Sequence, residues 1–371
     1  MNKNKEEENR NTGYGLETVR LVCLVLLFCL TAGILLFGCN GSEKEESSSG
    51  AQETVPALEY ASVPVSRYSL DYLDTFIEIK VFNNVEEEVL DHCFDIIASY
   101  ENRLSRTLAG TEIYELNETG TVEMEEDVLR LMEKGLYYSQ LSDGIFDITV
   151  EPVTSLWDFK AETPALPEAG ALEEAVKHVD YTKLSIDGNR VTLSDPESGV
   201  DLGAIAKGYV ADQVKAYLVE QGVNSAIINL GGNVLCIGTK PDGSTFNVGL
   251  QYPFGARDDL IAIVRIDDFS VVTSGIDQRN FTLDGKLYHH ILNTETGYPC
   301  ENGLLSVTII SENSVDGDGL STSCFALGLE KGMELIDSID GIYAAFVTED
   351  YEIHYSKGFE EHIAVTDGQK G

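Results

Sequence analysis

Asp318 and Thr322 could supply two oxygen ligands to one metal ion; they belong to the stretch VDGDGLSTSCFALG, residues 315–328. They are four residues apart, so they share one face at the start of the helix that we expect over Gly319–Gly328. A carboxylate and a hydroxyl, completed by a backbone carbonyl from elsewhere, make a hard-oxygen site suited to Mg²⁺. The alternative is that Asp318 only caps the helix. An EF-hand is excluded, because the acidic residue required later in that loop is missing.

A candidate anion site lies in DLGAIAKGYVADQVKAYLVEQGVNSAIINLGGN, residues 201–233. This stretch predicts a loop, a helix ended by Gly222, a buried strand and a glycine turn. An apolar stripe of helical period marks the helix: Ala206, Val210, Val214 and Leu218. The helix start carries Lys207 between Gly203 and Gly208, and free N–H groups there favour a bound anion. The alternative is an ordinary helix–strand unit whose glycines serve packing.

A candidate general base follows in VVTSGIDQRNF and DGKLYHHILNTETGYP, residues 271–281 and 284–299. The Asp-Gly turn at the start of the second segment brings His289 and His290 back beside the hydroxyls of the TSG sequence. Histidine titrates near neutral pH and can take a proton from a hydroxyl. Neighbouring strand residues face opposite sides, so only one of the two points into a site. The alternative is one core and one surface histidine.

Two weaker candidates complete the set. In SDGIFDITV, residues 142–150, an Asp-Gly turn could place Phe146 and Asp147 at the mouth of a cavity. The alternative there is a plain junction between a turn and a strand. Ser274 is a weak candidate for a hydrolase nucleophile, because nothing like a nucleophile elbow surrounds it.

The elements that must position these residues mix strands and helices without strict alternation, which favours an α+β fold over a doubly wound sheet. Helices are expected over Val85–Leu104 and Val128–Leu141, and a hairpin over Tyr181–Leu193. The expected strands are Leu73–Phe82, Ala226–Ile228, Phe246–Leu250, Ala262–Ile266, Phe269–Thr273, Leu304–Ile310, Gly341–Thr348 and Glu352–Tyr355.

Charge and cysteine usage exclude several classes of function. The 371 residues carry 63 acidic against 25 basic side chains, a net charge of −38, which excludes nucleic acid as a partner. A chain this acidic needs a cation to bind a phosphorylated ligand. The cysteines form no C-x-x-C pair, which disfavours a zinc or dithiol site. We expect Cys93, Cys236, Cys300 and Cys324 to be free buried thiols, and the alternative is that they form disulfides outside the cell.

The N-terminus predicts export. Residues 21–38 are uncharged and mostly apolar, so residues 1–38 read as a signal peptide or a membrane anchor. The sequence Leu36-Phe37-Gly38-Cys39 resembles a bacterial lipobox, with Cys39 as the lipidated residue. Residues 39–59 form an acidic, flexible tether, and residues 60–371 the folded domain. Whether the anchor is a lipid or a single membrane span, we expect the domain to lie at the cell membrane, on its extracytoplasmic face.

Taken together, DLGAIAKGYVAD, the NLGGN turn, DGKLYHHILNTETGYP and GDGLSTSCFALG resemble the ApbE family, the FAD:protein FMN transferases once described as thiamine-biosynthesis lipoproteins. The resemblance runs from about Leu73 to Gly328 and on to Tyr355. It implies an α+β, T-fold-like domain of two lobes with the flavin site between them. It also implies a magnesium ion held by the carbonyl of Ala204 and by Asp318 and Thr322.

The resemblance further implies which residues bind FAD, the substrate, and which act on it. FAD would contact Leu73, Thr107, Ile145, Phe146, Asp147, Lys207 and Ile291. His290 matches the histidine of the family and would take the proton, with Asp277 as a second candidate. The chain departs from the family pattern at Leu73, Asp74, Arg106, Thr107 and Asp277, and Gly317 and Gly319 flank Asp318 in place of alanines.

The implied reaction is Mg²⁺-dependent transfer of the FMN moiety of FAD to a threonine or serine hydroxyl of an acceptor protein, with release of AMP. The implied acceptor is a subunit of a membrane electron-transfer complex of the Rnf or Na⁺-pumping quinone reductase type. An FAD pyrophosphatase, a non-catalytic flavin-binding lipoprotein and a solute-binding lipoprotein remain alternatives on the sequence alone.

Overall fold

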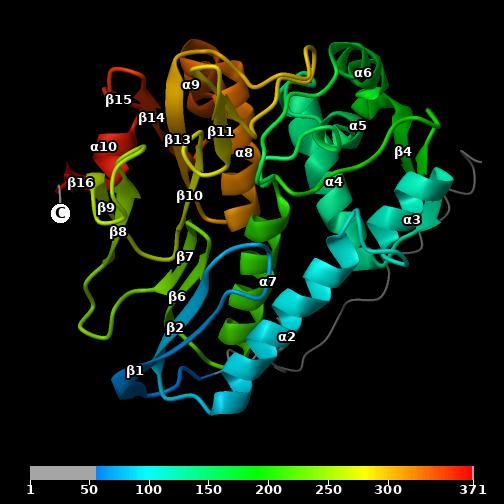
Figure 1. The fold of residues 1–371 in the computed structure, drawn as a ribbon. Coiled ribbons are helices and arrows are strands. Elements are labelled where there is room, and N and C mark those ends of the chain that lie inside the picture. The colour runs from blue at the N-terminus through cyan, green and yellow to red at the C-terminus, as the bar shows by residue number, and fades with distance from the viewer. Residues whose placement is uncertain (1–55, 370–371) are drawn as a thin grey trace, which may run out of the picture. The chain divides into compact units, whose positions relative to one another are not determined.

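An eight-stranded antiparallel sheet is the centre of the fold in the computed structural model, which describes residues 56–369 (Figure 1). Every neighbouring pair of strands in this sheet is antiparallel. In spatial order the strands are β1 (Tyr60–Ser69), β2 (Ile77–Asn83), β6 (Ser225–Leu230), β7 (Asn233–Gly238), β10 (Ser270–Gly275), β13 (Leu304–Ser311), β14 (Tyr343–Thr348) and β15 (Ile353–Tyr355).

A layer of helices covers one face of the sheet. It contains α2 (Glu87–Leu104), α4 (Glu126–Leu141), α7 (Ala206–Glu220), α8 (Ser314–Leu327) and α9 (Leu329–Asp337). The predicted stripe of α7 is buried at Val210, Val214 and Leu218, and Gly222 ends this helix with a φ of 83°. Its N–H donates to the carbonyl of Val219, while that of Val223 donates to the carbonyl of Leu218, as in a Schellman motif.

A smaller sheet covers the opposite face. Its strands are β8 (Phe246–Gln251), β9 (Leu260–Ile266) and β16 (Ala364–Asp367), and α10 (Phe359–His362) packs with them. Strand β13 therefore lies between apolar layers, and all eight of its residues are buried. This explains why its sequence, LLSVTIIS, carries apolar residues on both faces of the strand instead of on one face only.

Short elements form the rest of the described chain. They are α3 (Glu112–Thr119), β3 (Thr121–Glu123), α5 (Glu151–Thr154), α6 (Ala169–Ala175), the 3₁₀ turns η1 (Val176–His178) and η2 (Tyr181–Lys183), β4 (Leu184–Asp187), β5 (Arg190–Leu193), β11 (Asn280–Leu283) and β12 (Lys286–His289). An aromatic cluster holds the hairpin β11–β12 against the segment after α5. There Trp157 stacks on Phe159 and contacts Phe281, Tyr288 and Tyr298.

The predicted α+β class is confirmed, and the predicted helices and strands are present with two corrections. The strand predicted over Leu73–Phe82 begins only at Ile77, because Leu73 and Asp74 both adopt a left-handed backbone with φ of 54°. The helix predicted to begin at Gly319 begins at Ser314, with Asn313 as its N-cap. Asp318 is thus the fifth residue of α8 and does not cap it.

The predicted free thiols are also confirmed, since Cys93, Cys236, Cys300 and Cys324 are buried and unpaired. The predicted signal or anchor, Cys39 and most of the predicted tether lie outside the described residues. Between residues 56 and 369, the helices are all too short or too polar to cross a membrane.

Helices α7 and α8 approach each other so closely at Gly208 that a side chain has no room. A Cβ atom at this position would lie 2.3 Å from the backbone oxygen of Ser314. We expect Gly208→Ala to lower the free energy of unfolding by about 1–3 kcal/mol, since backbone must move to accept the methyl group.

Gly170→Ala in α6 is the matched control, because a Cβ atom there meets nothing within 4 Å. The control should leave stability unchanged or slightly raised. Thermal unfolding of the two variants and the parent protein measures the difference, and equal melting temperatures for both variants would contradict the close packing of α7 on α8.

Candidate active site

A cavity of about 920 Å³ contains most of the predicted site residues. Its walls come from the loop before β2, the segment after α2, the start of α7, β10, the residues after β12, and α8. The lining includes the predicted residues Thr107, Ile145, Phe146, Asp147, Ala204, Lys207, His290, Ile291, Asp318 and Thr322. Leu73 and Asp277 are not among the lining residues, although their neighbours Asp74 and Gln278 are.

Asp318 occupies the buried end of this cavity, where α7 and α8 cross. Its carboxylate accepts hydrogen bonds from the backbone N–H of Gly208, at 2.6 Å, and from the amide of Asn233, at 3.2 Å. The residue is only 4% exposed. Burial raises the pKa of this carboxyl, while nearby Lys207 acts in the opposite direction. A buried carboxylate that receives only neutral donors favours a bound cation.

Further oxygen atoms surround Asp318. Thr322 follows one helical turn later, and its hydroxyl lies 3.2 Å from that of Ser274 at the end of β10. The Ser274 hydroxyl in turn lies 2.8 Å from that of Ser321. Ala204 lies in the loop before α7 and lines the same cavity. A carboxylate, hydroxyls and a nearby backbone carbonyl are the donor set that Mg²⁺ prefers, so these residues fit the predicted ion.

His290 lines the cavity and uses one ring nitrogen within the fold. Its Nδ1 lies 3.3 Å from the carbonyl of Arg279, which can only accept, so Nδ1 carries the proton and Nε2 keeps its lone pair. Burial, and then the positive charge of Arg279, lower the pKa of this imidazole to about 4. His290 is therefore neutral at physiological pH and can accept a proton at Nε2.

His289, the residue before His290, has a different role, as expected for adjacent residues that face opposite sides of a strand. Its Nε2 donates to the carbonyl of Cys300 at 3.0 Å, and its Nδ1 accepts from the N–H of Ile291 at 3.3 Å. Its ring also packs edge-on against Phe325. Both nitrogens are thus used within the fold, and His289 anchors the segment that carries His290.

Basic side chains gather in this cavity despite the acidity of the chain. Lys207 and Arg279 line it and make no ion pair with any residue of the described part of the chain. Arg106 is held between two carboxylates, Glu151 and Asp201, each at 3.1 Å. The positive charges of Lys207 and Arg279 are therefore available to an anionic ligand.

Asp147 lines the cavity, and its carboxylate is used in hydrogen bonds that hold the cavity wall together. Its carboxylate accepts from the N–H and hydroxyl of Thr149, at 2.8 and 2.7 Å, and from the N–H of Tyr181, at 2.8 Å. Burial raises the pKa of this carboxyl, and these hydrogen bonds oppose that rise. The residues around it, Ile145, Phe146, Trp157 and Ile291, give this part of the cavity apolar and aromatic walls.

The sequence did not single out Arg279, which lines the cavity, or two residues that hold α8. Asn233 is 2% exposed; its amide holds Asp318, and its side-chain oxygen accepts from the Ser314 hydroxyl at 2.6 Å. Asp212 is partly buried and accepts from the N–H groups of Ser314 and Val315, at 2.7 and 2.9 Å, so it caps α8 from α7. Both lie in motifs quoted above, but only the fold shows that they meet α8.

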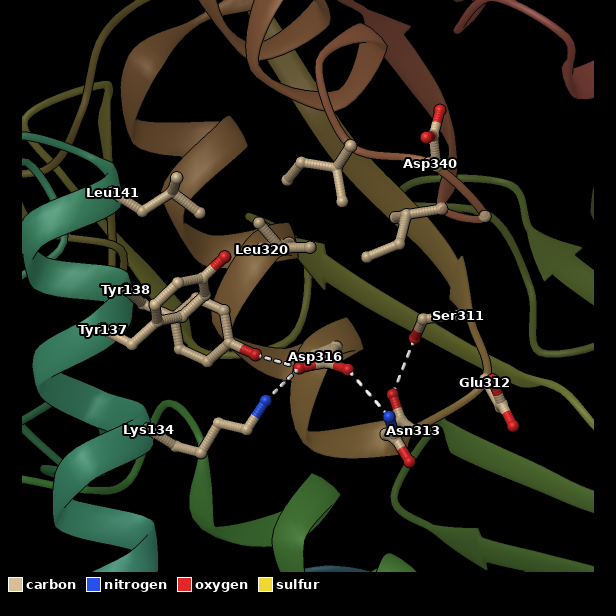
Figure 2. A pocket seen from close by; sticks show the side chains of 13 residues that line it. Lys134, Tyr137, Tyr138, Leu141, Ser311, Glu312, Asn313, Asp316, Leu320 and Asp340 are labelled. Atoms are coloured by element: carbon tan, nitrogen blue, oxygen red, sulfur yellow. Dashed lines mark hydrogen bonds and ion pairs between the residues drawn. The ribbon is translucent and has the colours of Figure 1, made fainter. Parts of the chain in front are cut away.

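A second cavity, of about 310 Å³, lies on the other side of α8 (Figure 2). Asp316 is its central polar group and accepts from Tyr138, from Lys134 at 2.9 Å and from Asn313 at 3.0 Å. These contacts satisfy the carboxylate within the fold. Asp316 therefore ties α4 to α8, whereas Asp318, two residues later, faces the larger cavity.

The sequence profile of the ApbE family matches residues 73–347, about three quarters of the chain. The chain belongs to the ApbE family. Its relatives include proteins named FAD:protein FMN transferase from Klebsiella pneumoniae and Treponema pallidum. The first is 35% identical over 78% of this chain and 91% of its own length, and the second 30% identical over 76% and 82%.

Solved structures of ApbE proteins share the fold. A crystal structure of the ApbE protein from Thermotoga maritima superimposes with a TM-score of 0.74 and 29% identity, covering 81% of this chain and 99% of that protein. The apo form of the flavinyl transferase ApbE from Pseudomonas stutzeri gives a TM-score of 0.72, also at 29% identity, covering 81% and 96%. The family predicted from four motifs is therefore confirmed.

The low pKa of His290 makes stability depend on pH. The unfolded chain takes up a proton at this residue near its ordinary pKa of 6.5, but the folded protein does so only near 4. The protein should therefore lose stability as the pH falls from about 6.5 to 4, by on the order of 2–3 kcal/mol at the lower end. His290→Gln removes this contribution.

Melting temperatures of the parent protein and His290→Gln, measured between pH 7 and pH 4, test this expectation. The difference between the two proteins should shift in favour of the variant as the pH falls. Parallel curves would contradict the assignment of a depressed pKa to His290.

Proposed function

We propose that the protein is an FAD:protein FMN transferase that moves the FMN moiety of FAD onto a threonine or serine hydroxyl of an acceptor protein and releases AMP. The observation that carries this proposal is the buried Asp318 with Thr322 beside it, at the end of a cavity that also holds Lys207 and His290. The names of the relatives from Klebsiella pneumoniae and Treponema pallidum support it.

Asp318, Thr322 and the carbonyl of Ala204 would hold Mg²⁺. The bound ion would neutralise charge on the pyrophosphate of FAD and stabilise the charge that builds up during phosphoryl transfer. Asn233 and Gly208 hold the carboxylate in place, at 3.2 and 2.6 Å. Lys207 and Arg279, free of ion pairs among the described residues, would bind the phosphate oxygens directly.

The other residues of the cavity would orient the flavin and the acceptor. The apolar wall of Ile145, Phe146 and Ile291 would receive the flavin, and Thr107 lines the same cavity. The acceptor hydroxyl attacks the phosphorus of the FMN moiety, the bond from this phosphorus to the bridging oxygen breaks, and AMP leaves with that oxygen. His290 takes the hydroxyl proton at Nε2, and its pKa rises once an anionic substrate lies beside it.

We further propose where the reaction takes place. The apolar run of residues 21–38 and the lipobox-like sequence ending at Cys39 support a membrane anchor, lipid or single-span, with the enzyme on the extracytoplasmic face. An acceptor on the same face would be a subunit of a membrane electron-transfer complex of the Rnf or Na⁺-pumping quinone reductase type. The net charge of −38 disfavours any nucleic-acid partner.

The decisive variant is Asp318→Asn, which keeps the shape of the side chain but removes the charge that would hold the ion. We expect it to lower FMN transfer at least 100-fold, and EDTA to do the same to the parent protein. The full chain is incubated with FAD, MgCl₂ and a candidate acceptor domain, and a denaturing gel is imaged for flavin fluorescence.

Asp340→Asn is the control, since this aspartate is exposed and lines only the second cavity. A labelled acceptor band that survives both Asp318→Asn and EDTA would overturn the metal-dependent transferase. Free FMN and AMP without a labelled band would indicate an FAD pyrophosphatase that uses water as the acceptor. FAD that is bound but unchanged would indicate a flavin-binding protein without catalysis.

The two candidate bases can be separated by kinetics. His290→Gln should lower kcat by about 10²–10⁴-fold, the usual contribution of a general base, with little change in the KM for FAD. Asp277→Asn should have a small effect, because Asp277 is not among the residues that line the cavity. A large loss of kcat in Asp277→Asn with little loss in His290→Gln would reverse the assignment.

A further inference from the structure

A cluster of metal-binding side chains lies outside the cavity described above. Glu174 in the last turn of α6 and His178 at the end of η1 are four residues apart, so they share one helical face. Glu197 reaches them from the turn after β5. One ligand atom from each of the three residues lies within 4.8 Å of the other two. Figure 1 shows α6 and β4 in this part of the molecule.

His178 makes the hydrogen bond that is typical of metal-binding histidines, in which one ring nitrogen contacts a carboxylate. Its Nδ1 lies 3.0 Å from Oδ2 of Asp195, an ionised carboxylate that also accepts from Lys183 at 3.0 Å. The hydrogen bond from the N–H of Glu197, followed by those from Lys183 and His178, holds the pKa of the Asp195 carboxyl well below its usual range. The carboxylate fixes the proton on Nδ1, which directs the other nitrogen, Nε2, toward the two glutamates.

The Nε2 atom is buried and makes no hydrogen bond. It faces Oε2 of Glu197 at 2.9 Å and Oε1 of Glu174 at 3.8 Å. A tetrahedral ion with bonds of about 2.0–2.1 Å separates its ligands by roughly 3.4 Å, a value between these two distances. This leaves a buried ring nitrogen without a hydrogen bond beside two carboxylates, and a cation among the three atoms would satisfy all of them.

The local charge also favours a divalent ion. Four carboxylates gather here, those of Glu174, Asp180, Asp195 and Glu197, against two ammonium groups, those of Lys177 and Lys183. The charges of these six groups sum to −2, which one divalent cation cancels. Imidazole with carboxylates selects zinc and related transition metals, whereas the all-oxygen set around Asp318 selects magnesium.

We propose that Glu174, His178 and Glu197 form a second metal site, for a divalent transition-metal ion of the Zn²⁺ class, with Asp195 orienting His178. The ion would join α6 to the turn at residues 194–198. That turn leads to Gly199, which hydrogen-bonds to the N–H of Glu151, and to Asp201, which binds Arg106 in the large cavity. The site is therefore structural, and its existence does not depend on the proposed transferase activity.

The test measures Zn²⁺ affinity and the visible absorption of bound Co²⁺ on the full chain, in excess Mg²⁺ to occupy the Asp318 site. We expect one equivalent of Zn²⁺ to bind, to raise the melting temperature and to displace Co²⁺ from a tetrahedral site. His178→Gln and Glu197→Gln should each weaken Zn²⁺ binding at least 30-fold, and Asp195→Asn about 10- to 100-fold.

His354→Gln, at a half-buried histidine of β15, is the matched control and should bind Zn²⁺ as the parent protein does. Asp318→Asn should also keep the site, which separates it from the magnesium site. Glu197 is 69% exposed, so its variant should fold even if His178→Gln does not. Equal Zn²⁺ binding by the parent, His178→Gln and Glu197→Gln, or no binding at all, would overturn the site and leave His178 as a member of an ion-pair network only.

Discussion

The crossing of α7 and α8 is the constraint on which the rest of this structure depends. Gly208 allows the two helices to meet backbone to backbone, and its N–H then donates to the buried carboxylate of Asp318 at 2.6 Å. Asp212, one turn farther along α7, binds the first N–H groups of α8. The same contact thus joins the helices and places a carboxylate at the end of the large cavity. Stability and the site depend on a single packing arrangement.

The electrostatics of the cavity differ from those of the chain as a whole. A net charge of −38 repels an anionic ligand, yet the cavity presents Lys207 and Arg279 without ion-pair partners among the described residues and holds Arg106 between two carboxylates. The fold places a few basic side chains where phosphate would lie and leaves most acidic residues at the surface. A bound divalent ion would complete this arrangement, because it adds positive charge beside the buried carboxylate.

The chain contains two clusters of polar side chains, one around Asp318 and one around His178, and they differ in the atoms they offer to a metal ion. Around Asp318 the donors are oxygen atoms inside the fold, whereas around His178 an imidazole joins two exposed carboxylates. The turn between them, residues 194–201, runs from the second cluster to Asp201 in the large cavity. A short, hydrogen-bonded segment therefore connects His178 to Asp201, which holds Arg106 in place.

The sequence by itself determined the family and the α+β class, and it named ten predicted site residues that line the large cavity. Helical spacing placed Asp318 and Thr322 on one face, and strand alternation separated His289 from His290. These are short-range patterns that one segment can carry. The tertiary structure alone decided that Asn233 and Asp212 hold α8, and that Leu73 and Asp277 are not among the lining residues of the cavity. It also decided that α8 begins at Ser314, because Asp212 from another helix satisfies the first N–H groups. Contacts between distant segments leave no local period in the sequence, so only the folded chain shows them.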